Sequence, residues 1–389
     1  MRDKPNALVM NRILVLLLLS FYSFTALAQS SFFEERPLFV NGVGGYECYR
    51  IPAIVAAKDG TLLAFVEGRV NGCSDYGDVD LLLSRSKDRG KTWSEPNLIV
   101  DNEGIQAGNP APVYDFEDPR YPNGRLFLFY NTGDASEHEV RKGNGQRGVH
   151  FISSTDDGLS WSLPTDITSQ VHFNRQNSKL DWRTNAVTPG HALQLSLGVN
   201  KGRIYVPANH SQGPPQEKYN EYRAYGFYSD DHGQSFKTSP DIPVLSSNEA
   251  IGVELENGDL MLNIREQNGD TKTRLVSISN DGGESWNEIF FDQNLISPVC
   301  QSSIISIVNS NKQLLLYSGP YSKTDRHQMS VLISEDQGKS WPVRKLIYAD
   351  TSAYSDLVIL DDNSIGLFYE RDRNGLYFAR FNLPWLYEN

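Results

Sequence analysis

Short apolar segments alternate with polar turns along most of the chain, a pattern that predicts β-strands joined in hairpins. Five apolar segments are each followed by the same motif, Ser-x-Asp-x-Gly-x-x-Trp, in which Phe replaces Trp once. A motif that returns in this way indicates an array of similar structural units. The apolar segments are 79–83, 149–152, 224–228, 273–278 and 329–333, and the motif copies are 86–93, 154–161, 229–236, 279–286 and 334–341.

Each motif copy has the chemistry of a turn between two strands. The Ser and Asp side chains can accept hydrogen bonds from nearby backbone N–H groups, and the Gly permits a positive φ. The closing aromatic residue offers a large apolar face at the start of the next strand. We therefore expect each copy to form a β-hairpin and to serve the structure, not the chemistry.

The motif copies resemble the Asp boxes of the sialidase superfamily. This resemblance implies an all-β fold, a six-bladed β-propeller with five Asp-box hairpins that lie away from the active site. The chain after Trp341 is long enough for a sixth blade without a motif, and we expect the segment before the first motif to add a strand to it. Two polar tracts, 104–124 and 165–190, are predicted to be loops over one face.

Residues 1–28 have the features of a secretory signal peptide, followed by a single catalytic domain at 29–389. Basic residues precede an apolar run at 13–19, and 26–28 read Ala-Leu-Ala, a small-residue cleavage site. The run is too short to span a bilayer stably, and no other stretch is long and apolar enough. We expect an exported protein, periplasmic or secreted, without stable membrane insertion.

The net charge limits the classes of binding partner, and the cysteine and histidine content limits the disulfides and metal sites that the chain can form. A formal net charge of −12 argues against nucleic acid and anionic membranes. Cys48 and Cys73 could pair in an oxidising compartment, although nothing in the sequence requires it, and Cys300 completes an odd count. None of the seven histidines falls in a metal-binding spacing, so we expect neither a metal nor another cofactor.

Three arginines stand in unusual settings. Arg50 lies in Tyr-Arg-Ile-Pro, Arg265 follows an apolar run, and Arg326 lies in Asp-Arg-His-Gln. A guanidinium among apolar residues needs partners, and Arg suits bidentate binding of a carboxylate. The three positions match the arginine triad of the sialidase family. The resemblance implies that they bind the carboxylate of sialic acid.

Asp75 follows in a polar segment, Cys-Ser-Asp-Tyr-Gly-Asp-Val-Asp. In the family an Asp at this place is the acid/base, and its loop position suits a group that must reach a leaving oxygen. Asp78 and Asp80 are close rivals. Arg69, in Glu-Gly-Arg, resembles the accessory arginine of the family, which lies beside the carboxylate and ring hydroxyls of the substrate.

Three more residues are assigned by the same resemblance. Tyr354, in Ala-Tyr-Ser, matches the family's nucleophile, and Glu249 has the spacing from Arg265 of the Glu that pairs with it. Glu370 matches a Glu that holds the first triad arginine by a salt bridge. Loops at 104–112 and 188–194 are expected near the N-acetyl group.

These residue types suit one reaction. A carboxylate nucleophile would approach the anomeric carbon of sialic acid against like charge, whereas a neutral phenol would not, once a base activates it. The resemblance therefore implies an exo-α-sialidase that acts with retention on sialylated glycoproteins, glycolipids or oligosaccharides. The alternatives are a trans-sialidase, an intramolecular trans-sialidase, or a non-catalytic propeller that binds sialoglycans.

Overall fold

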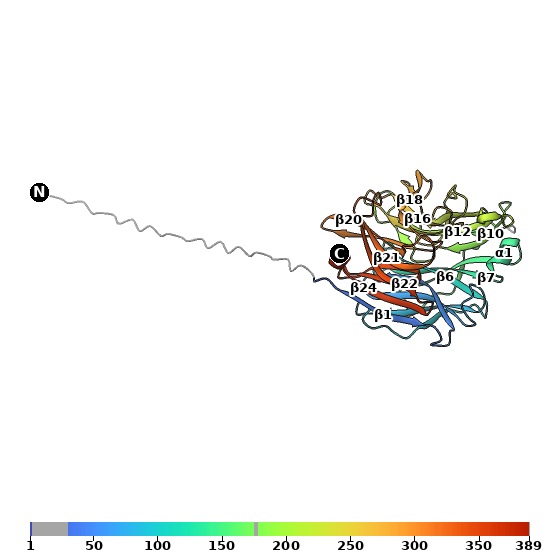
Figure 1. Cartoon of the computed structure of the whole chain (residues 1–389), viewed down its shortest axis with the longest axis horizontal. Helices are drawn as coiled ribbons and strands as arrows, with labels where there is room; N and C mark the ends of the chain where they lie inside the picture. Colours follow the sequence, from blue (N-terminus) through green and yellow to red (C-terminus); the bar gives the residue numbers. More distant parts are fainter. Residues whose placement is uncertain (2–29, 175–177, 389) are drawn as a thin grey trace. The chain divides into compact units, whose positions relative to one another are not determined.

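Strands dominate the regular structure of the chain (Figure 1). The structure is a computed structural model that describes every residue except 2–29, 175–177 and 389. Apart from Met1, the predicted signal peptide therefore lies outside the described residues. Contacts group Ser31–Asn389 into one compact unit, separate from Met1–Ser30. Within the described residues, no helix has the length and apolar character needed to cross a membrane.

The strands of Ser31–Asn389 pair into four sheets, which we divide into six antiparallel units that follow one another along the chain. Unit 1 consists of β2 (Cys48–Ala56), β3 (Leu62–Arg69), β4 (Val79–Ser86) and β5 (Asn97–Val100); unit 2 of β6 (Gln106–Asp115), β7 (Arg125–Gly133), β8 (Arg147–Ser154) and β9 (Thr165–Asp166); and unit 3 of β10 (Trp182–Val187), β11 (Leu193–Gln194), β12 (Ile204–Gln212), β13 (Tyr222–Ser229) and β14 (Lys237–Thr238). Unit 4 consists of β15 (Ser247–Glu254), β16 (Leu260–Glu266), β17 (Thr273–Ser279) and β18 (Glu288–Ile296); unit 5 of β19 (Ser303–Asn309), β20 (Lys312–Pro320), β21 (His327–Ser334) and the first part of β22 (Val343–Ile359); and unit 6 of the rest of β22, β23 (Ile365–Arg371), β24 (Gly375–Phe381) and β1 (Phe33–Val40). A parallel pairing of Val79 with Gln106 joins units 1 and 2, and β22 joins units 5 and 6. The described helical segments are short: α1 (Glu137–Lys142), α2 (Thr168–Val171), α3 (Leu383–Tyr387) and a 3-10 turn at Glu217–Tyr219.

Two strands connect the last units with each other and with the N-terminal segment. Residues 343–351 of β22 pair with β21, and residues 352–359 of the same strand pair with β23. Strand β1 pairs antiparallel with β24 (Figure 1). The prediction that the segment before the first motif adds a strand to the last unit is thus confirmed.

The middle strands are buried on both faces. Every residue of β3 and of β16 is buried, whereas β18 exposes several of its residues. A strand that is covered on both faces needs apolar residues at consecutive positions, not at alternate ones. This explains runs such as Leu-Leu-Ala-Phe-Val in β3, and it means that each unit packs face to face against its neighbours.

The five motif copies fold into the same hydrogen-bonded turn, and the hairpin prediction is confirmed. In the first copy, the backbone N–H of Gly90 donates to Ser86 Oγ at 2.8 Å, and the N–H of Thr92 donates to Asp88 Oδ1 at 2.8 Å. The other copies repeat this pattern. The closing aromatic residue precedes the next strand and does not begin it.

Each motif turn lies against the preceding unit, and the first turn lies against the sixth. A Cβ added at Gly90, in the turn of unit 1, would lie 2.1 Å from Phe378 Cε1 in β24 of unit 6. The order of contacts between units is therefore cyclic, because β22 joins units 5 and 6 and the turn of unit 1 lies against unit 6. The other turns make equivalent contacts: Gly158 with Leu83, Gly233 with Phe127, Gly283 with Tyr205 and Gly338 with Met261.

The prediction that 104–124 and 165–190 are loops was wrong in part. The first tract contains β6, and the second contains β9, α2 and β10. Pro and Asn suggested loops, but nine of the ten residues of β6 are buried, including Pro110 and Pro112. Strands β6 and β10 are the first strands of units 2 and 3, and some of their polar side chains line a cavity that is described below.

We expect Gly90→Ala to lower the free energy of unfolding by about 2–4 kcal/mol, because the added Cβ meets Phe378 and the φ of +79° disfavours alanine. Gly104→Ala is the matched control, since Gly104 has a φ of +82° with no atom within 4 Å of the added Cβ. It should cost about 1 kcal/mol through backbone strain alone. Urea denaturation measures both, and equal losses would contradict close packing between units 1 and 6.

Candidate active site

The eight residues assigned from the sequence lie at one end of the units. Because antiparallel strands reverse direction, the start of a first strand, the end of a second strand and the connection to the third share one end of a unit. The motif turns follow third strands and therefore lie at the opposite end. The third residue of a first strand is Arg50 in unit 1, Glu249 in unit 4 and, counted from Ser352, Tyr354 in unit 6. The ends of second strands carry Arg69, Arg265 and Glu370. The connections between second and third strands carry Asp75 and Arg326.

The pairing of first and second strands shifts register at the same place in five units. Such a shift, a β-bulge, bends a strand and redirects its side chains. In unit 1 the bulge includes Ile51, whose φ of 63° is costly for a β-branched residue. The bulges thus direct residues of the first strands into one cavity. They lie between Arg50 and Ala53, Gly108 and Ala111, Trp182 and Asn185, Ser247 and Ala250, and Ser352 and Ser355.

Seven of the eight residues line one cavity of about 220 Å³. The eighth, Glu370, lines an adjoining cavity of about 720 Å³ together with Arg50 and Arg326. The structure therefore brings together all the residues that the sequence assigned. They are Arg50, Arg69, Asp75, Glu249, Arg265, Arg326 and Tyr354 in the smaller cavity, with Glu370 behind Arg50.

A buried tyrosine, a carboxylate and a guanidinium form the centre of the smaller cavity. The hydroxyl of Tyr354, a residue that is 6% exposed, donates to Glu249 Oε1 at 2.6 Å. Arg265 Nη1 lies 2.5 Å from Glu249 Oε2 and donates to the Tyr354 hydroxyl at 2.9 Å. Glu249 is thus placed to accept the phenolic proton, and Arg265 faces the oxygen that would lose it.

The environment keeps the phenol of Tyr354 neutral. Burial raises its pKa well above the usual value, and the charge of Glu249 raises it further. Arg265, Arg326 and Arg50 lower the pKa, but they do not outweigh burial. Tyr354 can therefore act as a nucleophile only while its proton passes to a base.

Two further guanidinium groups lie over the Tyr354 ring. Those of Arg50 and Arg326 lie 5.1 Å and 5.4 Å from the ring centroid. Arg50 is held by Glu370, with Nε 3.0 Å from Oε1, and the backbone N–H of Ile51 donates to the same oxygen at 3.0 Å. The N–H groups of Arg326 donate to a backbone carbonyl, with Nη2 at 2.8 Å. Three cations thus surround one phenol.

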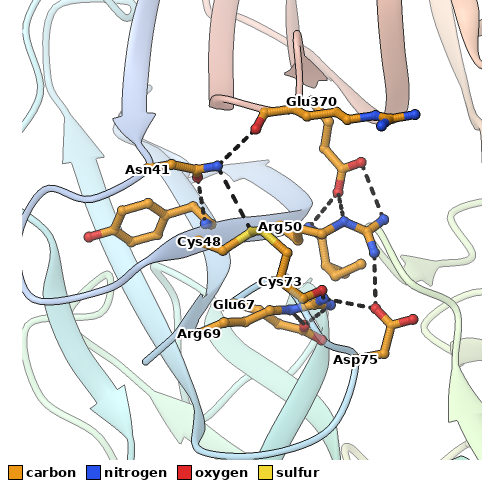
Figure 2. The surroundings of a disulfide bond; sticks show 11 residues. Asn41, Cys48, Arg50, Glu67, Arg69, Cys73, Asp75 and Glu370 are labelled. Atoms are coloured by element: carbon orange, nitrogen blue, oxygen red, sulfur yellow. Dashed lines mark hydrogen bonds and ion pairs between the residues drawn. A yellow bond between two sulfur atoms is a disulfide. The ribbon is translucent and has the colours of Figure 1, made fainter. Parts of the chain in front are cut away.

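Asp75 lies at the rim of the cavity, between two of the arginines (Figure 2). Its Oδ1 lies 3.0 Å from Arg50 Nη1 and 2.8 Å from Arg69 Nη1, and 77% of its side chain is exposed. Arg69 itself is buried and paired with Glu67 at 2.7 Å. The carboxylate of Asp75 is therefore open to the cavity while it bridges two guanidinium groups.

The two arginines keep Asp75 ionised. Loss of hydration raises the pKa of Asp75, but the charges of Arg69 and Arg50 outweigh it and hold the pKa below its usual value. In this arrangement Asp75 is a base. It would act as an acid only after its contact with the arginines weakened.

Only part of the remaining cavity wall was predictable from the sequence. Of the two tracts expected near the N-acetyl group, 104–112 contributes Gln106 and Asn109, but 188–194 contributes no residue that lines the cavity. Strand β10 also lines the cavity, with residues 184–186. Polar residues are common in strands, so the sequence does not distinguish these residues from others. Their side chains lie beside the bulges, which direct them into the cavity.

One other cluster of the described residues has the spacing of a metal site. Oxygen atoms of Asp115 and Asp118 and a ring nitrogen of His232 lie within 4.8 Å of one another. The carboxylate of Asp118 is already paired with Arg120 at 2.7 Å, and His232 Nδ1 lies 2.7 Å from Asp115 Oδ2. None of these residues lines the cavity that contains Tyr354.

Comparison with known proteins identifies relatives over most of the chain. A family model described as a BNR repeat-like domain matches residues 58–368. A sialidase of Micromonospora viridifaciens is 32% identical over 373 residues, which cover 91% of this chain and 54% of the relative. A sialidase of Bacteroides fragilis is 30% identical over 343 residues, which cover 83% of this chain and 60% of the relative. The chain thus spans little more than half the length of these curated relatives.

A solved structure resembles the chain in three dimensions. A Hadza microbial sialidase superposes with a TM-score of 0.76 at 26% sequence identity. The match covers 87% of this chain and 66% of that protein.

We expect Glu249→Ala to lower the free energy of unfolding by about 2–4 kcal/mol, because it leaves the buried guanidinium of Arg265 without its carboxylate. Glu249→Gln, which keeps an acceptor for the tyrosine hydroxyl, should cost less. Glu335→Ala is the control, because Glu335 forms an exposed ion pair with Lys312 at 3.1 Å. This variant should change the free energy of unfolding very little. Urea denaturation of the three variants tests this order, and equal stability of the two Glu249 variants would contradict it.

Proposed function

The chain belongs to the family of the BNR repeat-like domain, and from this we propose that it is an exo-α-sialidase. It hydrolyses the bond between a terminal sialic acid and the rest of a glycoprotein, glycolipid or oligosaccharide, with retention of configuration. The sialidases of Micromonospora viridifaciens and Bacteroides fragilis, to which the chain is similar, support this activity.

One observation carries the proposal: the hydroxyl of Tyr354 donates to Glu249 in a cavity lined by five arginines, three of which lie around the phenol. A tyrosine paired with a base is a nucleophile for an electrophilic carbon that already bears a negative group. The arginines provide the countercharge that such a substrate needs. No other pair of side chains in this cavity combines these properties among the described residues.

The arginine cluster binds the substrate carboxylate. Arg50, Arg265 and Arg326 come from units 1, 4 and 5 and meet around Tyr354. Glu370 and Glu249 each neutralise one of these cations and fix its direction. Arg69 lies at the other side of Asp75 and assists at the carboxylate or ring hydroxyls.

The first half of the reaction moves two protons. Tyr354 Oη forms a bond to the anomeric carbon while its proton passes to Glu249. The glycosidic C–O bond breaks, and Asp75 in its protonated form gives its proton to the leaving oxygen. The product is a covalent glycosyl–tyrosine with a free alcohol.

The second half reverses these roles. Asp75, now ionised, takes a proton from water, and the water oxygen attacks the anomeric carbon from the side that the leaving group vacated. The bond to Tyr354 breaks, and Glu249 returns its proton to the phenolic oxygen. Two displacements at one carbon give net retention.

Substrate binding changes the proton affinity of Asp75. In the free protein, Arg50 and Arg69 hold its pKa down. A substrate carboxylate that binds to Arg50 competes for this guanidinium and adds a negative charge nearby. Both effects raise the pKa of Asp75 and turn it from a base into an acid.

The remaining assignments follow from the same proposal. Residues 1–28 direct export to the periplasm or the medium, and 29–389 form one catalytic domain. The reaction needs neither a metal nor another cofactor, because the protein's own residues supply every proton and charge in it. Water, not a second sugar, is the acceptor in this proposal.

We expect Tyr354→Phe to lower the release of a fluorescent phenol from an aryl α-sialoside by about a thousandfold or more, the scale on which enzymes depend on a nucleophile. Tyr114→Phe is the matched control, because Tyr114 is 5% exposed and its hydroxyl donates to the carboxylate of Asp157 at 2.8 Å, outside the cavity. That variant should keep its activity.

Product analysis completes this test. NMR of the wild-type reaction should detect the α-anomer of free sialic acid first, as retention requires. Initial release of the β-anomer would exclude the covalent route, and a sugar conjugate in place of free sialic acid would indicate transfer. A wild type that releases no phenol would leave the sialoglycan-binding propeller as the better interpretation.

We expect the alkaline limb of kcat to lie at a higher pH than the alkaline limb of kcat/KM. The limb in kcat/KM reports the free enzyme, where the pKa of Asp75 is lowered, so the acid loses its proton at low pH. The limb in kcat reports the complex, where that pKa is raised. Steady-state rates from pH 3 to about 9 measure both limbs. Coincident limbs would show that binding does not change the proton affinity of the acid.

A further inference from the structure

Asp75 lies on a segment that the apolar core does not hold. Residues 70–78 connect β3 to β4 without a strand, and none of them is buried. A segment with no buried apolar contacts has little to oppose its movement. Yet a general acid must lie within hydrogen-bond reach of the leaving oxygen. Something other than packing must fix the position of this carboxylate.

Ion pairs hold Asp75 only in its charged form. Its carboxylate contacts Arg50 and Arg69, and its backbone carbonyl accepts from Gln106 Nε2 at 3.0 Å. An acid that is ready to give up a proton is neutral, so its attraction to both guanidinium groups has weakened. The two contacts that hold the carboxylate itself are therefore weakest when Asp75 is protonated, and the hydrogen bonds that remain hold only its neighbours and its backbone, such as that from the Tyr76 hydroxyl to the carbonyl of Asp134 at 2.7 Å.

A covalent link does not depend on charge. Cys73 forms a disulfide with Cys48, the first residue of β2 (Figure 2). Cys48 is 2% exposed, and the side chain two residues later is that of Arg50. The bond thus ties the loop, two residues before Asp75, to the strand that carries a carboxylate-binding arginine. Arg69 Nη1 reinforces this place by donating to the carbonyl of Cys73 at 2.7 Å.

We propose that the Cys48–Cys73 disulfide is a positioning device for Asp75, which keeps the acid over the leaving oxygen when the protonated carboxyl no longer pairs with the arginines. This inference rests on the proposed sialidase reaction. The disulfide touches no reacting atom. It acts through Asp75 alone, so its removal impairs proton donation and spares the attack by Tyr354.

The test is a series of aryl α-sialosides whose leaving phenols range from strongly to weakly acidic. A strongly acidic phenol leaves almost without help, whereas a weakly acidic one needs a proton in the transition state. In the variant Cys48→Ala/Cys73→Ala, we expect kcat/KM to fall about tenfold or more for the least acidic phenol, part of what a general acid contributes. For the most acidic phenol it should fall less than about threefold, so the dependence on leaving-group pKa becomes steeper.

A second variant keeps the disulfide but loosens its connection to Asp75. Two glycines inserted between Ser74 and Asp75 lengthen the tether, and the same steepening is expected. Asp75→Asn marks the full loss of the acid, and removal of both cysteines in that background should add no further steepening. Thermal denaturation reports whether each variant is folded, and if the cysteine variant is not, the insertion variant decides.

The outcomes separate the two proposals. A wild type that cleaves none of the aryl sialosides overturns the proposed function. An active wild type whose leaving-group dependence is unchanged in the folded variants overturns the positioning role. Equal losses for every phenol also overturn it, because a disulfide that only stabilised the fold would produce that result.

Discussion

The charge balance around the Tyr354 hydroxyl is the constraint on which the rest of the site depends. Three guanidinium groups converge on one buried phenol, and cations at that density cannot lose water without carboxylates beside them. Glu249 and Glu370 provide them from units 4 and 6. Each carboxylate also has a second partner, the phenolic hydroxyl for Glu249 and a backbone N–H of β2 for Glu370. The same contacts thus neutralise two of the arginines and orient the Tyr354 hydroxyl.

The fold separates this polar centre from the turns of the repeated motif. The motif turns lie at one end of the units, where each packs against the preceding unit and is closed by its own Ser and Asp side chains. The charged residues lie at the other end, where the bulges of the first strands redirect backbone and side chains. Backbone strain is present there too, at Ile51. A rigid repeated scaffold can therefore carry one irregular, highly charged cavity.

Asp75 differs from the other site residues in how it is fixed. Tyr354 and Glu249 are set by buried strands, whereas Asp75 lies on an exposed connection and is held by ion pairs and a disulfide. In the proposed reaction Asp75 changes its protonation state, so charge alone would not fix its position. The acidic protein thus concentrates cations around Tyr354 and Asp75, and it has a covalent bond beside the one carboxylate whose charge would change in the proposed reaction.

The sequence by itself determined the repeated units, because each motif copy contains the donors and acceptors of its own turn. In the first copy these hydrogen bonds lie within Ser86–Thr92, and four later copies repeat them. It also indicated the site residues through a family resemblance, and the structure gathers all eight around one centre. Only the tertiary structure decided that Cys48 pairs with Cys73, that β6 is a buried strand, and that β10 forms part of the cavity wall. Those features depend on contacts between distant segments and on bulges that redirect side chains, and neither leaves a local pattern of apolar and polar residues.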